Sequence, residues 1–191
     1  MAGCDPLVTI ASPMSARSLY ARLLGPAFER LAPALKSIHD ARAMKLYVGR
    51  CDIRGGDSWI ARTIARLAGL PLARTDVPVE ITINATAGSE DWLRKFGTQR
   101  MQSRLVDRNQ CLEERLGPMV LTFALTAQPD RILWTLQSAR LALFPLPMTW
   151  LLRCAAAETI HDGRYGFDAT AHVRGIGLIV HYKGWLVEHD G

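Results

Sequence analysis

The stretch that decides the fold runs from Cys154 to Val187 and reads CAAAETIHDGRYGFDATAHVRGIGLIVHYKGWLV. Two runs of strand-forming residues flank Asp162-Gly163, a pair that strongly favours a two-residue type I′ turn. The turn fixes which residues face each other across the two strands. The predicted pairs are Ile160–Tyr165, Glu158–Phe167, Ala156–Ala169 and Cys154–Ala171.

This pairing separates an apolar face from a polar one. The residues of the polar face are Arg153, Thr159, Arg164, Asp168, Thr170 and His172. A second tight turn, predicted at Gly175-Ile176, extends the apolar face onto a third strand. Its predicted pairs are Val173–Leu178, Ala171–Val180, Ala169–Tyr182 and Phe167–Gly184.

Glu158 is the single charged residue on the apolar face of these three strands. A buried carboxylate either becomes protonated or acquires a cationic partner, because burying it charged and alone is costly. The candidate partners are Arg50, Arg54 and Arg94, and the missing side chain of Gly184 leaves space beside the carboxylate. Two interpretations remain open: a structural Glu–Arg pair that holds the sheet against the helices, or a catalytic carboxylate.

Helical spacing of apolar residues marks the N-terminal part of the chain. Residues 15–24 predict a short helix that Ser15 can cap, and the apolar stripe continues from Phe28 to Ile38. Asp57 or Ser58 begins a further helix that ends at Gly69. The apolar stripe of that helix is Trp59, Ile60, Ile64, Leu67 and Ala68.

Strand patterns dominate after Pro78, where the apolar residues begin to alternate. The predicted strands are residues 46–53, 79–83, 92–96, 99–106, 119–127, 132–143, 151–160, 164–173 and 178–187. Residues 132–143 also fit a helical face, so helix is an alternative there. The predicted fold is α+β, with N-terminal helices that cover a strongly curved, mostly antiparallel β-sheet or half-barrel. We expect a tail over residues 1–14 and one domain over residues 15–191.

Composition narrows the classes of function. The chain has 191 residues, of which 49% are hydrophobic, and a net charge of +5. Its basic residues are dispersed, so nucleic-acid binding is not expected. The absence of a secretory signal and of a transmembrane segment predicts a cytoplasmic protein. Neither the four cysteines nor the five histidines have metal-ligand spacing, and no glycine-rich phosphate loop is present, so we expect no metal and no cofactor.

Small residues in the middle of predicted strands leave room for a pocket. They are Ala124, Ser138, Ala155, Ala156, Ala157, Gly166 and Ala169. Close helix packing or sheet curvature explains the same residues equally well. The ligand-binding residues predicted for the pocket are Trp92, Arg94, Glu158, Phe167, Tyr182 and Trp185.

Segments along almost the whole chain resemble a known bacterial family, domain of unknown function 4166. They are residues 20–25, 54–56, 69–71, 90–97, Glu114 before Gly117-Pro118, residues 162–168 and residues 182–186. The resemblance implies no reaction. It implies a role beside nicotinamide-dependent oxidoreductases, to which domains of this kind are sometimes fused. Lys95 departs from the pattern, which has a second arginine there.

Three hypotheses of function follow. The first is a domain that binds a small apolar or amphipathic ligand. The second is an isomerase or cyclase in which Glu158 carries a proton and Arg94 stabilises the oxyanion. The third is a docking module for an oxidoreductase partner, which predicts an exposed apolar patch in place of a pocket.

Overall fold

The computed structural model describes residues 17–39, 44–86, 88–141, 144–145, 151–161 and 163–189. The helices are α1 (Leu19–Leu24), α2 (Pro26–Glu29), α3 (Pro33–His39) and α4 (Trp59–Leu67). The strands are β1 (Met44–Gly55), β2 (Arg74–Ala85), β3 (Ser89–Phe96), β4 (Gln99–Arg108), β5 (Cys111–Leu116), β6 (Met119–Gln128), β7 (Arg131–Leu141), β8 (Phe144–Pro145), β9 (Leu152–His161), β10 (Arg164–Val173) and β11 (Gly177–Glu188).

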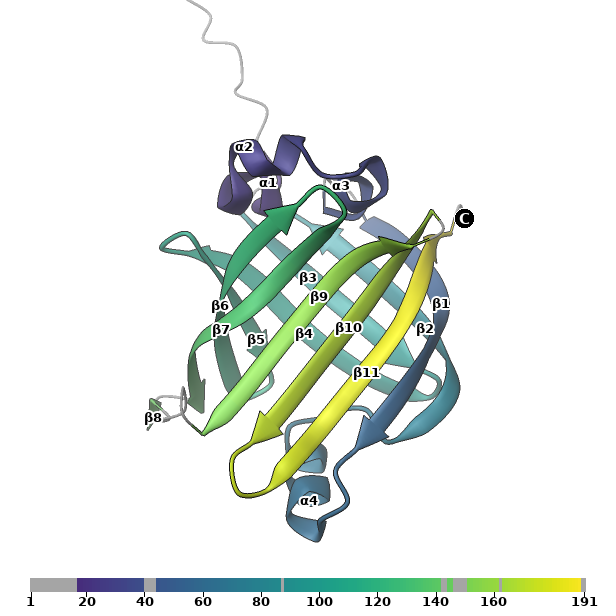
Figure 1. Ribbon diagram of the computed structural model, residues 1–191, viewed down its shortest axis with the longest axis vertical. Coiled ribbons are helices and arrows are strands. Elements are labelled where there is room, and N and C mark those ends of the chain that lie inside the picture. Colours follow the sequence, from purple (N-terminus) through teal and green to yellow (C-terminus); the bar gives the residue numbers. More distant parts are fainter. Residues whose placement is uncertain are drawn as a thin grey trace, which may run out of the picture.

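Ten of the strands that the structure describes wrap into a closed antiparallel barrel (Figure 1). The order around it is β6-β5-β4-β3-β2-β1-β11-β10-β9-β7, and β6 pairs with β7 to close the ring. The expected antiparallel sheet is therefore present, but its half-barrel form is wrong. Closure leaves no long strand edge open to water, which an open sheet of this length would expose.

Strand β5 was not predicted from the sequence. Glu113, Glu114 and Arg115 stand side by side in it, so the strand lacks the usual alternation of apolar and polar residues. Both carboxylates are nevertheless buried and bound to arginines: Glu113 to Arg115 and Arg140, and Glu114 to Arg94. Such ion pairs can place charged residues in a barrel wall, and a pattern based on hydrophobicity does not detect them.

The predicted β9–β10 register is confirmed for every pair, including Glu158–Phe167. Gly163 has φ +72°, as the turn requires, whereas Asp162 lies outside the described residues. Three of the four predicted β10–β11 pairs are also confirmed. The fourth is wrong, because a bulge follows Ala171 and shifts Val173 onto Gly177.

The three N-terminal helices cover one end of the barrel (Figure 1). Ser18 caps α1 by accepting a hydrogen bond from the Ala21 amide. The predicted cap, Ser15, lies outside the described residues. The Ala32 amide donates to the Pro129 carbonyl in the β6–β7 turn at 2.7 Å. This contact fixes the helices at the end of the barrel where α3 delivers His39 to the interior.

Helix α4 lies at the opposite end of the barrel (Figure 1). Ser58 caps it as expected. The predicted core stripe is wrong in part, because α4 buries Ala61 and Ala65 and leaves Trp59 70% exposed. A Cβ built on Gly56 would stand 2.6 Å from the Ala61 Cβ, so the helix packs too closely for larger side chains on its inner face.

Candidate functional site

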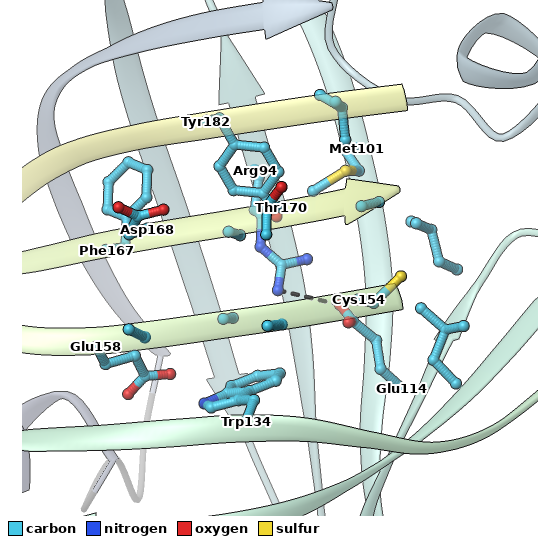
Figure 2. Close-up of a pocket in the computed structure, with 18 of the residues that line it drawn as sticks. Arg94, Met101, Glu114, Trp134, Cys154, Glu158, Phe167, Asp168, Thr170 and Tyr182 are labelled. Carbon is cyan, nitrogen blue, oxygen red and sulfur yellow. Dashed lines mark hydrogen bonds and ion pairs between the residues drawn. The ribbon is translucent and has the colours of Figure 1, made fainter. Parts of the chain in front are cut away.

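A cavity of about 120 Å³ lies inside the barrel (Figure 2). Its lining is mainly apolar and includes Phe96, Met101, Leu121, Trp134, Cys154, Ala156 and Ala169. Burial raises the pKa of the Cys154 thiol to about 12, so this side chain stays neutral. The volume is close to that of an engineered apolar cavity of about 150 Å³ that binds benzene.

Arg94 brings a buried positive charge to the cavity wall. It extends from β3 and is 6% exposed, and its guanidinium donates to Ser103 Oγ at 2.6 Å and to Glu114 Oε1 at 3.1 Å. The guanidinium also stacks over the Trp92 ring, 4.7 Å from the ring centroid. Burial acts to lower the pKa of Arg94, but the charge and hydrogen bond of Glu114, together with Tyr182 and Tyr20, outweigh burial and raise the pKa above its ordinary value, so Arg94 remains charged.

Glu158 has a partner that the sequence analysis did not consider. Its Oε2 atom forms a buried hydrogen bond with His39 Nε2, and the Tyr165 hydroxyl also hydrogen-bonds to Glu158. None of the three candidate arginines is this partner: Arg50 pairs with Asp76, Arg94 pairs with Glu114, and Arg54 is exposed. His39 reaches the carboxylate from α3, an element that the pairing of the last three strands does not include.

A polar cluster surrounds His39 at this end of the barrel. The Tyr20 ring stacks on the His39 ring with 3.6 Å between centroids, and Glu90 accepts a hydrogen bond from the Trp92 indole at 2.8 Å. Four buried polar atoms of the cluster have no partner among the described residues: Tyr20 OH, His39 Nδ1, Glu90 Oε1 and Trp134 Nε1. Unsatisfied buried groups cost stability, and such costs often accompany a functional site.

Burial raises the pKa of Glu90 to about 6, from an ordinary value of 4.5, although the nearby His39 lowers it. The folded protein therefore holds this proton more tightly than the unfolded chain does. The resulting stabilisation is complete below pH 4.5 and is lost as the pH rises through 6. It corresponds to about 2 kcal/mol.

Replacing Glu90 with Gln removes this contribution. Between pH 4.5 and 7, the free energy of unfolding of the wild type should fall by about 2 kcal/mol relative to that of Glu90→Gln. Urea unfolding at several pH values measures the difference. Glu29→Gln, which changes an exposed carboxylate, is the control. Parallel pH profiles for the wild type and Glu90→Gln would contradict the assignment.

Five of the six predicted ligand-binding residues line the cavity. They are Trp92, Arg94, Glu158, Phe167 and Tyr182. Trp185 does not line it, because it lies on the outward side of β11, where the Arg164 guanidinium packs 4.6 Å from its ring centroid. Gly184 leaves no free space either: a Cβ there would lie 2.8 Å from the Phe167 ring and 2.3 Å from the Arg50 carbonyl.

Of the small residues predicted in the middle of strands, some line the cavity and one allows close packing. Ala156 and Ala169 line the cavity together with Ala155 and Ala157. Gly166 serves close packing, since a Cβ there would stand 2.8 Å from Thr159 Oγ1. Ala124 and Ser138 do not line the cavity.

The missed site residues are Tyr20, His39, Glu90 and Glu114. Strand periodicity was a usable signal for Glu90, because it lies two and four residues before Trp92 and Arg94 and so shares their face. No comparable signal existed for His39, whose position depends on how α3 docks on the barrel. Among the described residues, no cluster of three or more His, Cys, Asp or Glu side chains could hold a metal ion.

A comparison with the profiles of known protein families shows to which family this chain belongs. The profile of the family described as "Domain of unknown function (DUF4166)" matches residues 31–186. The chain belongs to this family. The DUF4166 match runs from α3 into β11 and includes both residues of the His39–Glu158 pair.

Two further comparisons add little about function. A search of curated proteins found no match. Among solved structures, "Crystal Structure of Rv2717c from M. tuberculosis" is similar, with 13% identity, a TM-score of 0.47, and coverage of 84% of this chain and 99% of that one. No helix in the described part of the chain is long and apolar enough to span a membrane.

Proposed function

We propose that this DUF4166 domain binds a small, uncharged and mainly apolar ligand inside the barrel. The observation that supports the proposal is the cavity of about 120 Å³ with the buried Arg94 in its wall. A cavity of this size fits a molecule of about the size of benzene or slightly larger. A drug-sized ligand would need a pocket of at least about 300 Å³.

Arg94 determines which polar group the ligand carries. Its hydrogen bonds to Ser103 and Glu114 use two of the five N–H donors of a guanidinium. The other donors can bind an acceptor atom in the cavity. Because Glu114 already balances the positive charge, a neutral acceptor such as a carbonyl suits the site better than a carboxylate.

Three probes that share one ring system test this proposal: 2-indanone, indane and indane-2-carboxylate. We expect 2-indanone to bind roughly tenfold or more tightly than indane, because it adds a hydrogen bond to a charged donor. Indane-2-carboxylate should not bind, because its charge would be buried near Glu158. Isothermal titration calorimetry gives the three dissociation constants.

Ala156→Leu tests whether the ligand binds inside the barrel. Its larger side chain would fill the cavity beside Trp134, to which Ala156 is paired, and should abolish binding. Thr135→Leu, on the exposed face of β7, should bind 2-indanone as the wild type does. Binding that survives Ala156→Leu, or is lost equally in both variants, would exclude the barrel interior as the site.

A second candidate function is proton transfer on the bound ligand. The observation that favours it is that Glu158 lines the cavity, while His39, which is not among the lining residues, contacts its carboxylate. In such a reaction Glu158 removes a proton from the carbon next to a carbonyl, and Arg94 stabilises the oxygen of the resulting enolate. Returning the proton to another carbon completes an isomerisation without a further reactant.

A further inference from the structure

Helix α4 exposes three of its four large apolar side chains and buries its small ones, and only Ile64 among the large ones packs against the core. Leu67 is 78% exposed, Trp59 is 70% exposed and Ile60 is 39% exposed, whereas Ala61 and Ala65 are buried. A helix that served only to close the barrel would do the opposite. Together with Leu72, 52% exposed in the segment that follows, these three residues form what we call the α4 patch.

Hydrogen bonds hold the backbone that carries the α4 patch. Ser58 caps the start of the helix, and the Leu70 amide donates to the Ala65 carbonyl at its end. Gln99 at the start of β4 then holds the next segment from both sides: it accepts from the Leu72 amide at 2.8 Å and donates to the Leu70 carbonyl at 3.2 Å. The fold therefore fixes the backbone positions from which the exposed side chains extend.

Positive charge gathers around the patch. Between Arg54 and Thr75 the chain has four arginines and one acidic residue, Asp57. The arginines are Arg54, Arg62, Arg66 and Arg74, all exposed. Among the residues that the structure describes, none of these arginines forms an ion pair with a carboxylate. The α4 segment therefore carries a local excess of positive charge.

The patch also adjoins the cavity. Leu70 lines the cavity, and Leu72 is exposed only two residues later. The α4 end of the barrel therefore brings an apolar outer surface next to the inner lining.

We propose that the α4 patch docks on the surface of an anionic lipid bilayer. Trp59, Leu67 and Leu72 would enter the boundary between headgroups and acyl chains, and Arg62 and Arg66 would contact lipid phosphates. The proposal does not depend on ligand binding in the barrel.

The size of the patch favours a lipid surface over a protein. Nine residues make a helix about 14 Å long, with a diameter of about 10 Å. A stable protein interface takes about 800 Å² from each partner, far more than this one helix presents. A bilayer needs no such area, since apolar burial and the attraction of anionic lipids for basic residues act together.

Vesicle flotation tests the proposal with the full chain. We expect it to float with vesicles of phosphatidylcholine mixed with phosphatidylglycerol, to stay behind with phosphatidylcholine alone, and to lose binding as salt rises. Arg62→Gln with Arg66→Gln should weaken binding about thirtyfold, at about fivefold for each arginine. Leu67→Ser should weaken it comparably through lost apolar burial.

Met44→Ser is the matched control, because Met44 is 73% exposed at the opposite end of the barrel. It should float as the wild type does. All the replaced side chains are exposed, and equal melting temperatures would verify that every variant is folded. The proposal is overturned if the wild type fails to float with the mixed vesicles, or if Met44→Ser weakens binding as much as Leu67→Ser. Concentration-dependent dimers that Leu67→Ser abolishes, without vesicle binding, would identify a second copy as the occupant and overturn it as well.

Discussion

Arg94→Met should lower the free energy of unfolding by about 3–5 kcal/mol. The substitution leaves the carboxylate of Glu114 in the barrel wall without its cation. It also removes the hydrogen bond to Ser103 and the stacking on Trp92. Urea unfolding at neutral pH measures the change.

The double variant Arg94→Met/Glu114→Leu distinguishes the loss of the Arg94–Glu114 attraction from the cost of leaving Glu114 buried without a cation. Without either charge, most of the stability should return, since apolar pairs often replace buried ion pairs at little cost. Lys95→Met is the control, because its partially exposed pair with Glu80 should cost less than about 1 kcal/mol to remove. A small effect of Arg94→Met, with no recovery in the double variant, would show that Arg94 and Glu114 are not coupled.

Glu158→Gln should reduce the exchange of 2-indanone α-hydrogens with D₂O at least about a hundredfold relative to the wild type. In this exchange a C–H bond breaks as Glu158 takes the proton, the carboxyl exchanges that proton with solvent deuterium, and a C–D bond forms. Arg94 would stabilise the intermediate enolate. Loss of the 2-indanone proton signals in NMR spectra follows the exchange.

Ligand binding serves as the internal reference for this experiment. If Glu158 acts only on the proton, the dissociation constant of 2-indanone should change little in Glu158→Gln while exchange is lost. Wild-type protein that binds 2-indanone without accelerating exchange over buffer would remove the enzyme hypothesis and leave ligand binding intact. Equal exchange in wild type and Glu158→Gln would show that another group carries the proton.

The fold was most predictable where turns and alternating residues agree. Asp162-Gly163 sets the β9–β10 register, and the alternation carries it inward as far as Cys154. Closure of the barrel was not predictable, because the β1–β11 and β7–β9 pairings join strands that do not follow each other in the chain. The bulge after Ala171 shifts one pair, and nothing in the local pattern distinguishes it from a tighter turn.

The site was predictable on strands and unpredictable on helices. Trp92, Arg94 and Glu158 follow from strand periodicity, because alternate residues share a face. His39 sits on a short helix that is distant in sequence from Glu158, so its contact depends on tertiary packing. The same limit explains α4, where hydrophobic periodicity finds the helix but not the face that the barrel covers.

Intermolecular nuclear Overhauser effects between 2-indanone and alanine methyl groups test most directly whether the ligand lies inside the barrel. We predict contacts from 2-indanone to the methyl groups of Ala156 and Ala169, both of which line the cavity. Contacts confined to methyl groups of the α4 patch, such as those of Leu67, or to no methyl group of the barrel interior, would contradict internal binding.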